Sequence, residues 1–175
     1  GARAQGWQAF MNGNFGYGYG VQPIWALNWS YGEGLDDSSD ELGSYNRDDN
    51  WVEGLYAEGG QQVAYMKEFL EKYEWWKLVP CFNRSYYYEP NGWGYSVSTI
   101  GNDVYLGYFY GTNEAYRGLG TLRSMKNGDY TVTWFNCRTG KYEDPFTVTV
   151  TDGTYRIPKK PGDGDWVITV EYIGK

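Results

Sequence analysis

Hydrophobic and polar side chains alternate with a period of two through most of the second half of the chain. Between Tyr130 and Trp134, large apolar residues alternate with threonine, and this pattern predicts a half-buried β-strand. The next five residues, NCRTG, have turn chemistry, and Gly140 supplies a position that tolerates positive φ. An extended run restarts at Tyr142. Asp129–Tyr142 is therefore predicted to form a hairpin at the centre of an antiparallel β unit.

Six further segments have the composition of short strands. They are Tyr86–Tyr88, Tyr95–Ile100, Val104–Tyr110, Phe146–Thr151, Tyr155–Ile157 and Trp166–Ile173. Glycine, asparagine, aspartate and proline gather between these segments, as turns require. Short strands at such spacing predict an antiparallel β-sandwich of about seven strands, which we place at residues 84–175.

In the first half of the chain, apolar residues recur at the spacing of a helix instead. Ala2–Met11 places its large apolar residues on one face, and Asn12-Gly13 is a typical helix stop. Gly59–Tyr73 carries apolar residues at i, i+3, i+7 and i+10, which also predicts a helix. The intervening run NFGYGYG, residues 14–20, is interpreted as a strand against whose glycines something packs closely. The fold class is therefore α+β, with a mainly helical region at residues 1–83.

Leu27–Gly54 is predicted to be a long acidic loop, because it has eight carboxylates and one arginine. Loops of this length are often functional, and carboxylates suit Ca²⁺. The segment lacks the alternating D-x-D-x-D-G pattern of a calcium loop, so we interpret it as a solvated acidic loop. Glu33, Asp36 and Asp37 could serve as acid and base in principle, but nothing in the sequence orients them.

The amino-acid composition limits the classes of binding partner and of catalytic chemistry that the chain can have. The net charge of −7 disfavours nucleic acid and anionic membranes, whose binding relies on lysine and arginine. Nineteen tyrosines and nine tryptophans suit a neutral, flat-faced ligand such as a glycan or polysaccharide. The absence of histidine excludes Ser-His-Asp and Cys-His catalysis and histidine-ligated zinc. No apolar run reaches membrane-spanning length, so we expect no membrane insertion.

Three stretches together resemble the apiosidase-like glycoside hydrolases. RAQGWQAFMNGNFGYGYGVQPIW is similar to the end of their catalytic barrel, and AEGGQQVAYMKEFLEKYEWWKLVP resembles their last barrel helix. YFYGTNEAYRGLGTLRSMKNGDYTVTWFNCRTGKYE is similar to the β-sandwich that follows the barrel and is labelled a collagen-binding domain. The resemblance implies a helical remnant of a (β/α)8 barrel packed on that sandwich.

The chain departs from the family pattern at three positions. Tyr17 stands where the family strand usually has histidine. Cys81 and Cys137 stand where the family usually has aspartate and proline. Two unusual cysteines suggest that Cys81 and Cys137 are neighbours in space, and a disulfide and a shared buried contact both remain open.

The resemblance also implies what the chain lacks. Glycoside hydrolysis uses two carboxylates that flank the bond, and the family's pair lies on barrel strands that precede Gly1. We therefore expect no catalytic residue, no cofactor and no activity of the chain alone. The expected function is that of a C-terminal fragment of a secreted, periplasmic or cell-surface bacterial hydrolase, serving as a supporting or glycan-contacting module. The alternative is a self-standing carbohydrate-binding or cell-surface protein-interaction module.

Two groups of aromatic residues are candidates for sugar contact, because ring faces cover the apolar side of a sugar. They are Tyr17, Tyr19, Trp25 and Trp29 near the glycine-rich strand, and Tyr86, Tyr88 and Trp93 near the start of the sandwich. The competing interpretation is that both groups pack the helices and the sandwich together. The expected partners are a neutral glycan and an upstream barrel region of the same or an adjacent chain, and dimer formation is left open.

Overall fold

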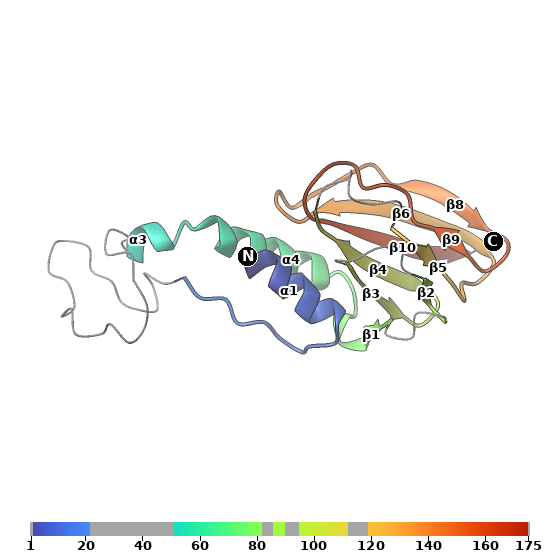
Figure 1. Cartoon of the computed structure of the whole chain (residues 1–175), viewed down its shortest axis with the longest axis horizontal. Coiled ribbons are helices and arrows are strands. Elements are labelled where there is room, and N and C mark those ends of the chain that lie inside the picture. Colours follow the sequence, from blue (N-terminus) through green and yellow to red (C-terminus); the bar gives the residue numbers. More distant parts are fainter. Residues whose placement is uncertain (1, 22–50, 82–85, 90–94, 112–118, 175) are drawn as a thin grey trace, which may run out of the picture.

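The computed structural model describes residues 2–21, 51–81, 86–89, 95–111 and 119–174. Its helices are α1 (Ala2–Met11), α3 (Trp51–Gly54) and α4 (Glu58–Leu70), and the 3-10 turn η2 (Trp75–Lys77) follows them. Ten strands come next. In Figure 1, α1 and α4 lie side by side next to the β-sheets, and α3 lies beyond the start of α4, on the side away from the sheets. None of the described helices combines the length and the hydrophobicity that crossing a membrane requires.

The strands form two antiparallel sheets. The strands are β1 (Val79–Pro80), β2 (Tyr88–Glu89), β3 (Tyr95–Ile100), β4 (Val104–Phe109), β5 (Thr121–Leu122), β6 (Gly128–Asn136), β7 (Lys141–Tyr142), β8 (Phe146–Val150), β9 (Tyr155–Arg156) and β10 (Trp166–Gly174). The larger sheet has the order β1-β3-β4-β10-β6-β7, with β8 also paired to β6, and the smaller has the order β2-β5-β9. The predicted α+β class is confirmed. The predicted hairpin is present as β6 and β7, which pair through Phe135 and Tyr142. Strands β1 and β5 were not predicted, because two residues are too few to show a period.

Both predicted helices are present. The predicted bounds of α1 are confirmed, and α4 begins one residue earlier and ends three residues earlier than predicted. On α4, Gln62, Met66 and Phe69 share one buried face, as their spacing requires. Gly13, at φ 88°, follows α1 as the C-terminal glycine, and its N–H bonds to the carbonyl of Phe10 at 3.1 Å.

The glycine-rich run at residues 14–20 is not a strand in the structure. That prediction is wrong because no described strand lies beside the run to bond with its backbone. Nothing lies within 4 Å of the space that a Cβ would occupy at Gly16 or Gly18. Close packing occurs instead at Gly6 of α1 and Gly59 of α4, whose backbones meet the rings of Tyr17 and Tyr19.

Strands β4 and β10, at the centre of the larger sheet, are buried on both faces. Strand β10 lies between β4 and β6, so that Val167 pairs with Tyr108 on one side and Phe135 on the other. These three side chains point to the helices and form the helix-facing cluster together with the helix residues Trp7, Met11, Met66, Phe69 and Leu70. The alternate residues face the smaller sheet and form the sandwich core, which includes Tyr105, Phe109, Tyr130, Val132, Trp134, Ile168 and Val170.

Aromatic contacts join the helices to the sheet. The Trp7 ring stacks on Tyr108 with 6.1 Å between centroids and meets the edge of Phe69 at 5.2 Å. Phe69 in turn lies 4.8 Å from Phe135 on β6. Trp7, Phe69 and Tyr108 are at most 1% exposed. Burial of each such side chain stabilises the fold by about 1.5–3 kcal/mol, so this contact holds the helices to the sheet.

The turn of the predicted central hairpin packs on α4. Gly140 has φ 69°, and its N–H bonds to the Asn136 carbonyl at 2.9 Å. The N–H of Arg138 bonds to the side-chain oxygen of Asn136 at 3.0 Å. A Cβ at Gly140 would lie 2.7 Å from the ring of Tyr65. Glycine is therefore required here both for the backbone conformation and for the contact with the helix.

The predicted division at residues 83 and 84 stays a prediction, but the structure shows why residues 1–80 should not fold alone. In that fragment the five helix residues of the helix-facing cluster would lose the sheet that covers them. We expect fragment 1–80 to give a poorly dispersed amide NMR spectrum or to associate. A well-dispersed spectrum from a monomeric fragment 1–80 would contradict the shared core, and the whole chain is the control.

Candidate functional site

A partly buried polar network lies where α1, α4 and the larger sheet meet. Arg3, in the first turn of α1, donates from Nε to Oδ2 of Asp165 at 2.6 Å. Tyr108 of β4 donates its hydroxyl to the same oxygen at 3.0 Å. Arg3 also donates from Nη1 to Oε1 of Gln62 at 2.7 Å, and Gln62 donates to Glu58. The side chains of Arg3 and Asp165 are 22% and 11% exposed, so water screens this ion pair weakly.

The loop before β10 is fixed by backbone contacts. Asp165 accepts a hydrogen bond at its carbonyl from the Cys137 N–H at 3.2 Å. Just before it, Gly164 adopts φ 88° and bonds through its N–H to the Gly111 carbonyl at 2.9 Å. The buried Lys160 ammonium donates to the carbonyls of Gly111 and Gly164 at 2.6 and 2.8 Å. The Asp165 carboxylate is therefore presented to the helices by an ordered loop.

The electrostatics of the network favour an ion pair that stays charged. Burial opposes the charge of Arg3, but the hydrogen bond and charge of Asp165 outweigh it and raise the Arg3 pKa. Burial, and then the negative charge of Asp165, raise the pKa of Tyr108, so its hydroxyl stays protonated and remains a donor. Burial lowers the pKa of Lys160. These groups join the elements together and do not form an acid–base pair.

The network does not have the composition of a hydrolytic site. Glycoside hydrolysis needs two carboxylates, about 5–9.5 Å apart, that can reach a substrate. Asp165 is engaged by Arg3 and Tyr108, and Glu58 accepts from Gln62. Across the described ranges, no group of three or more Cys, Asp or Glu is arranged to hold a metal ion. The geometry supports a structural clamp.

Tyr17 and Tyr19, predicted for sugar contact, lie over the helices. Tyr17 is half-buried against the helix-facing cluster, and its hydroxyl lies 3.4 Å from Oε1 of Gln5. The ring of Tyr19 lies against Gly59 at the start of α4. This placement matches the competing interpretation that they pack the helices. Trp25 and Trp29, like Glu33, Asp36, Asp37 and the rest of the acidic loop up to residue 50, lie outside the described residues.

The second aromatic group is divided by the structure. Tyr86 is 52% exposed and its ring meets Tyr87 edge-on at 4.4 Å. Tyr88 is 3% exposed and donates its hydroxyl to the Leu119 carbonyl at 2.6 Å. A glycan platform that includes Tyr88 is therefore wrong, because Tyr86 and Tyr87 lie in a turn and strand alternation begins only at Tyr88. Trp93 lies outside the described residues.

The predicted proximity of Cys81 and Cys137 is not found. Both are buried free thiols. Cys81 belongs to the sandwich core, whereas Cys137 belongs to the helix-facing cluster on the other face of the larger sheet. The prediction failed because the sequence does not show that the sheet lies between the two positions.

The clamp itself was missed by sequence reasoning. Arg3 and Gln62 are ordinary surface types on a predicted helix, and Asp165 falls in a Gly-Asp-Gly-Asp turn signal. The pairing joins residues 162 positions apart, and no periodicity reports such a contact. The available signal was the arginine that begins the helix in the family resemblance.

Comparisons with known proteins found a family match for the helical part of the chain and two solved structures with a similar fold. A family model, "Apiosidase-like, catalytic domain", matches residues 1–77, which end at η2 just before the sheet begins. A solved structure titled "Glycoside hydrolase" aligns with 98% of this chain at TM-score 0.74 and 19% identity, over 36% of its own length. A glycoside hydrolase family 5 structure from Bacteroides vulgatus aligns with 98% at TM-score 0.71 and 21% identity, over 35% of its length. No curated protein matches the sequence significantly.

The chain thus spans about a third of the length of these two structures. At such identities the likeness shows the fold alone. The resemblance to an apiosidase-like catalytic domain is supported over residues 1–77.

Removing one partner of the clamp should destabilise the whole chain. We expect Arg3→Met to lower the free energy of unfolding by about 2–4 kcal/mol, because Asp165 would remain buried without its cation. The exposed Lys67–Glu71 pair, at 2.7 Å, supplies the control, and Lys67→Met should cost about 0.5 kcal/mol or less. Urea denaturation measures both. Equal effects of the two variants would show that the clamp contributes no more than a surface pair.

The buried thiols should be unreactive in the folded protein. Burial raises the pKa of Cys81 to about 12 and that of Cys137 well above its usual range. We expect no reaction of the native protein with a disulfide reagent at pH 8. After unfolding in guanidinium, both thiols should react. Since the folded state favours the protonated thiol, stability should also fall as the pH rises from 9.0 towards 12. Rapid native labelling of either thiol would contradict the observed packing.

Proposed function

We propose that the chain is the C-terminal portion of a carbohydrate-degrading glycoside hydrolase, in which the β-sandwich supports the last elements of a catalytic barrel. The observation that carries the proposal is that the helical part and the β-sandwich share one apolar core. The helices lie within the segment that matches a catalytic-domain family model, and they are fixed to the sheet by the helix-facing cluster and the Arg3–Asp165 clamp.

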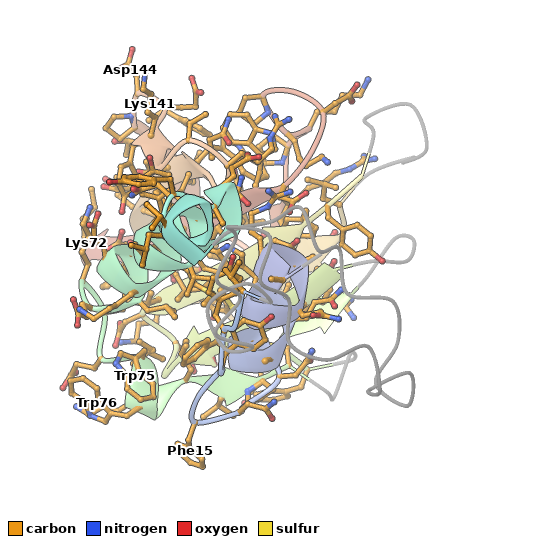
Figure 2. All side chains as sticks on the ribbon, turned by 90° about the vertical axis from the view of Figure 1, so that its left-hand side faces the viewer. Phe15, Lys72, Trp75, Trp76, Lys141 and Asp144 are labelled. Carbon is orange, nitrogen blue, oxygen red and sulfur yellow. The ribbon has the colours of Figure 1, made fainter. Side chains whose placement is uncertain are left out.

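Exposed apolar residues on the outer side of the helical part support the proposal that further barrel elements pack there. Tyr56 and Leu55, just before α4, are 84% and 58% exposed, and Val52 of α3 is 43% exposed. Phe15 is 83% exposed, and Figure 2 shows its side chain pointing out of the body. The neighbouring Gly16 has open space where a Cβ would lie. These exposed apolar side chains, and a run at residues 14–20 that pairs with no described strand, fit a neighbouring strand and helix of a barrel.

In this proposal the chain contributes position and not chemistry. Both carboxylates of the hydrolytic reaction come from the upstream barrel region, in the same or an adjacent chain. The clamp and the aromatic cluster fix α1 and α4 against a rigid sheet. A sheet buried on both faces moves little, so elements of the barrel that rest on it keep their positions.

We place this protein outside the bacterial cytoplasm, secreted, in the periplasm or on the cell surface, because polymeric glycans are degraded there. Its ligand in this proposal is a neutral glycan or polysaccharide. The alternative is a self-standing carbohydrate-binding or cell-surface protein-interaction module. The observation that favours this alternative is that α1 and α4 already cover one face of the larger sheet, so that this face needs no barrel.

The chain alone should release no new reducing ends from neutral plant-polysaccharide oligomers. The reason is that the carboxylates of the clamp, Asp165 and Glu58, are already engaged by Arg3, Tyr108 and Gln62. A reducing-end assay at substrate concentrations up to solubility measures this. Turnover that disappears on changing Glu33 or Asp36 to alanine would contradict the proposal, because it would place a catalytic site within the chain.

The supporting role has its own test. The coding region upstream of residue 1 is expressed from a second plasmid together with this chain, and we expect the two products to purify as one complex. Tyr56→Ala should weaken the complex, whereas Lys141→Ala on β7 serves as the exposed control far along the chain. Failure of the products to associate, with both folded, would favour the self-standing module.

A further inference from the structure

A pair of adjacent tryptophans lies at the end of the helical part, away from the polar clamp. Trp75 and Trp76 belong to η2, and their rings meet edge-to-face at 5.9 Å and 81°. Trp75 is half-buried and is held by the edge of Phe10 at 5.7 Å. Trp76 is 58% exposed. Figure 2 shows both rings at the lower edge of the molecule, with Trp76 on the outside.

Backbone hydrogen bonds hold the turn that carries the exposed ring. In η2 the Lys77 N–H bonds to the Glu74 carbonyl at 2.8 Å, and the Leu78 N–H bonds to the Trp75 carbonyl at 3.1 Å. The chain then enters the sheet at β1, whose Val79 pairs with Thr99 of β3. The turn is therefore fixed at both ends, by the helix-facing cluster and by the sheet. An aromatic face that is fixed in this way loses little freedom on binding.

Hydrogen-bonding groups flank the exposed ring within the same turn. Lys77 Nζ and Glu74 Oε1 lie 2.6 Å apart, and their side chains are 54% and 55% exposed. An exposed ion pair of this kind adds little stability, so both groups can exchange partners at small cost. They offer three N–H donors and carboxylate acceptors beside a flat apolar face. A sugar ring presents the matching combination of hydroxyl groups around a C–H face.

We infer that Trp76, supported by Trp75 and flanked by Glu74 and Lys77, is a surface site for a neutral glycan chain. A protein partner fits less well, because a stable interface buries about 800 Å² on each side and the large exposed apolar residues of this turn and β1 are Trp76 and Val79. An acidic glycan is disfavoured by the net charge of −7.

This site is separate from the part of the barrel-partner surface that Tyr56 and Leu55 form. Tyr56 and Leu55 precede α4, whereas Trp76 follows it, and a helix of 13 residues is roughly 20 Å long. The inference therefore does not depend on the proposed function. It gives the chain a way to hold a polysaccharide even where no catalytic barrel is joined to it.

Affinity electrophoresis of the whole chain tests the site. The gels contain a soluble mixed-linkage β-glucan, a galactomannan, an arabinoxylan or, as the acidic comparison, polygalacturonate. We expect at least one neutral polymer to retard the protein and polygalacturonate to have no effect. Trp76→Ala should weaken binding at least about tenfold, as loss of a central tryptophan usually does, and Trp76→Phe should keep part of it.

The matched control is Tyr56→Ala, which removes another exposed aromatic ring from the same chain and should leave retardation unchanged. Circular dichroism and urea unfolding confirm that each variant is folded. Absence of retardation of the unchanged chain by every neutral polymer would overturn the inference. Equal losses of polysaccharide binding in Trp76→Ala and Tyr56→Ala would also overturn it. A Trp76→Ala variant that changes sedimentation but not retardation would identify a protein interface instead.

Discussion

The larger sheet has two apolar faces, and the need to cover both determines the rest of the structure. One face is covered by the smaller sheet, as in any sandwich. The other carries Leu106, Tyr108 and Val167, all at most 1% exposed, and it is covered by α1 and α4 together with the residues that flank them. Non-directional apolar burial would allow the helices to slide or rotate on this face. The Arg3–Asp165 pair, with its fixed distance and geometry, selects one arrangement.

The value of the clamp is therefore specificity as much as stability. An ion pair in a weakly screened place loses much of its attraction to desolvation, and apolar residues of similar size can replace such pairs without loss of stability. Apolar residues cannot replace the directional geometry of a charged hydrogen bond. The Asp165 carboxylate joins β4 through Tyr108 and α1 through Arg3, and Arg3 continues to α4 through Gln62. We propose that this orientation matters because the outer side of the same helices receives the barrel.

The sequence revealed the elements that depend on local pattern and missed those that depend on distant partners. The alternation of apolar and polar residues predicted β6, and apolar residues at i, i+3, i+7 and i+10 predicted α4. In each case the buried face is visible within a short stretch of sequence. The glycine-rich run at residues 14–20 has strand composition but no described neighbour to bond with, and strands are defined by their neighbours. Tyr88 and Asp165 were misjudged or missed because their burial comes from residues 31 and 162 positions away.

Exposure on the helical part is not uniform, and its distribution separates two kinds of surface. Before α4 the exposed apolar residues Val52, Leu55 and Tyr56 follow one another closely, as expected of a surface that another folded element covers. After α4 the exposed tryptophan is bordered by a lysine and a glutamate that bond to each other. Covering exposed apolar side chains such as these with a protein element is favourable, because apolar surface leaves water. A ring bordered by donors and acceptors is better matched by a ligand that replaces those hydrogen bonds, and a hydroxyl-rich sugar does so.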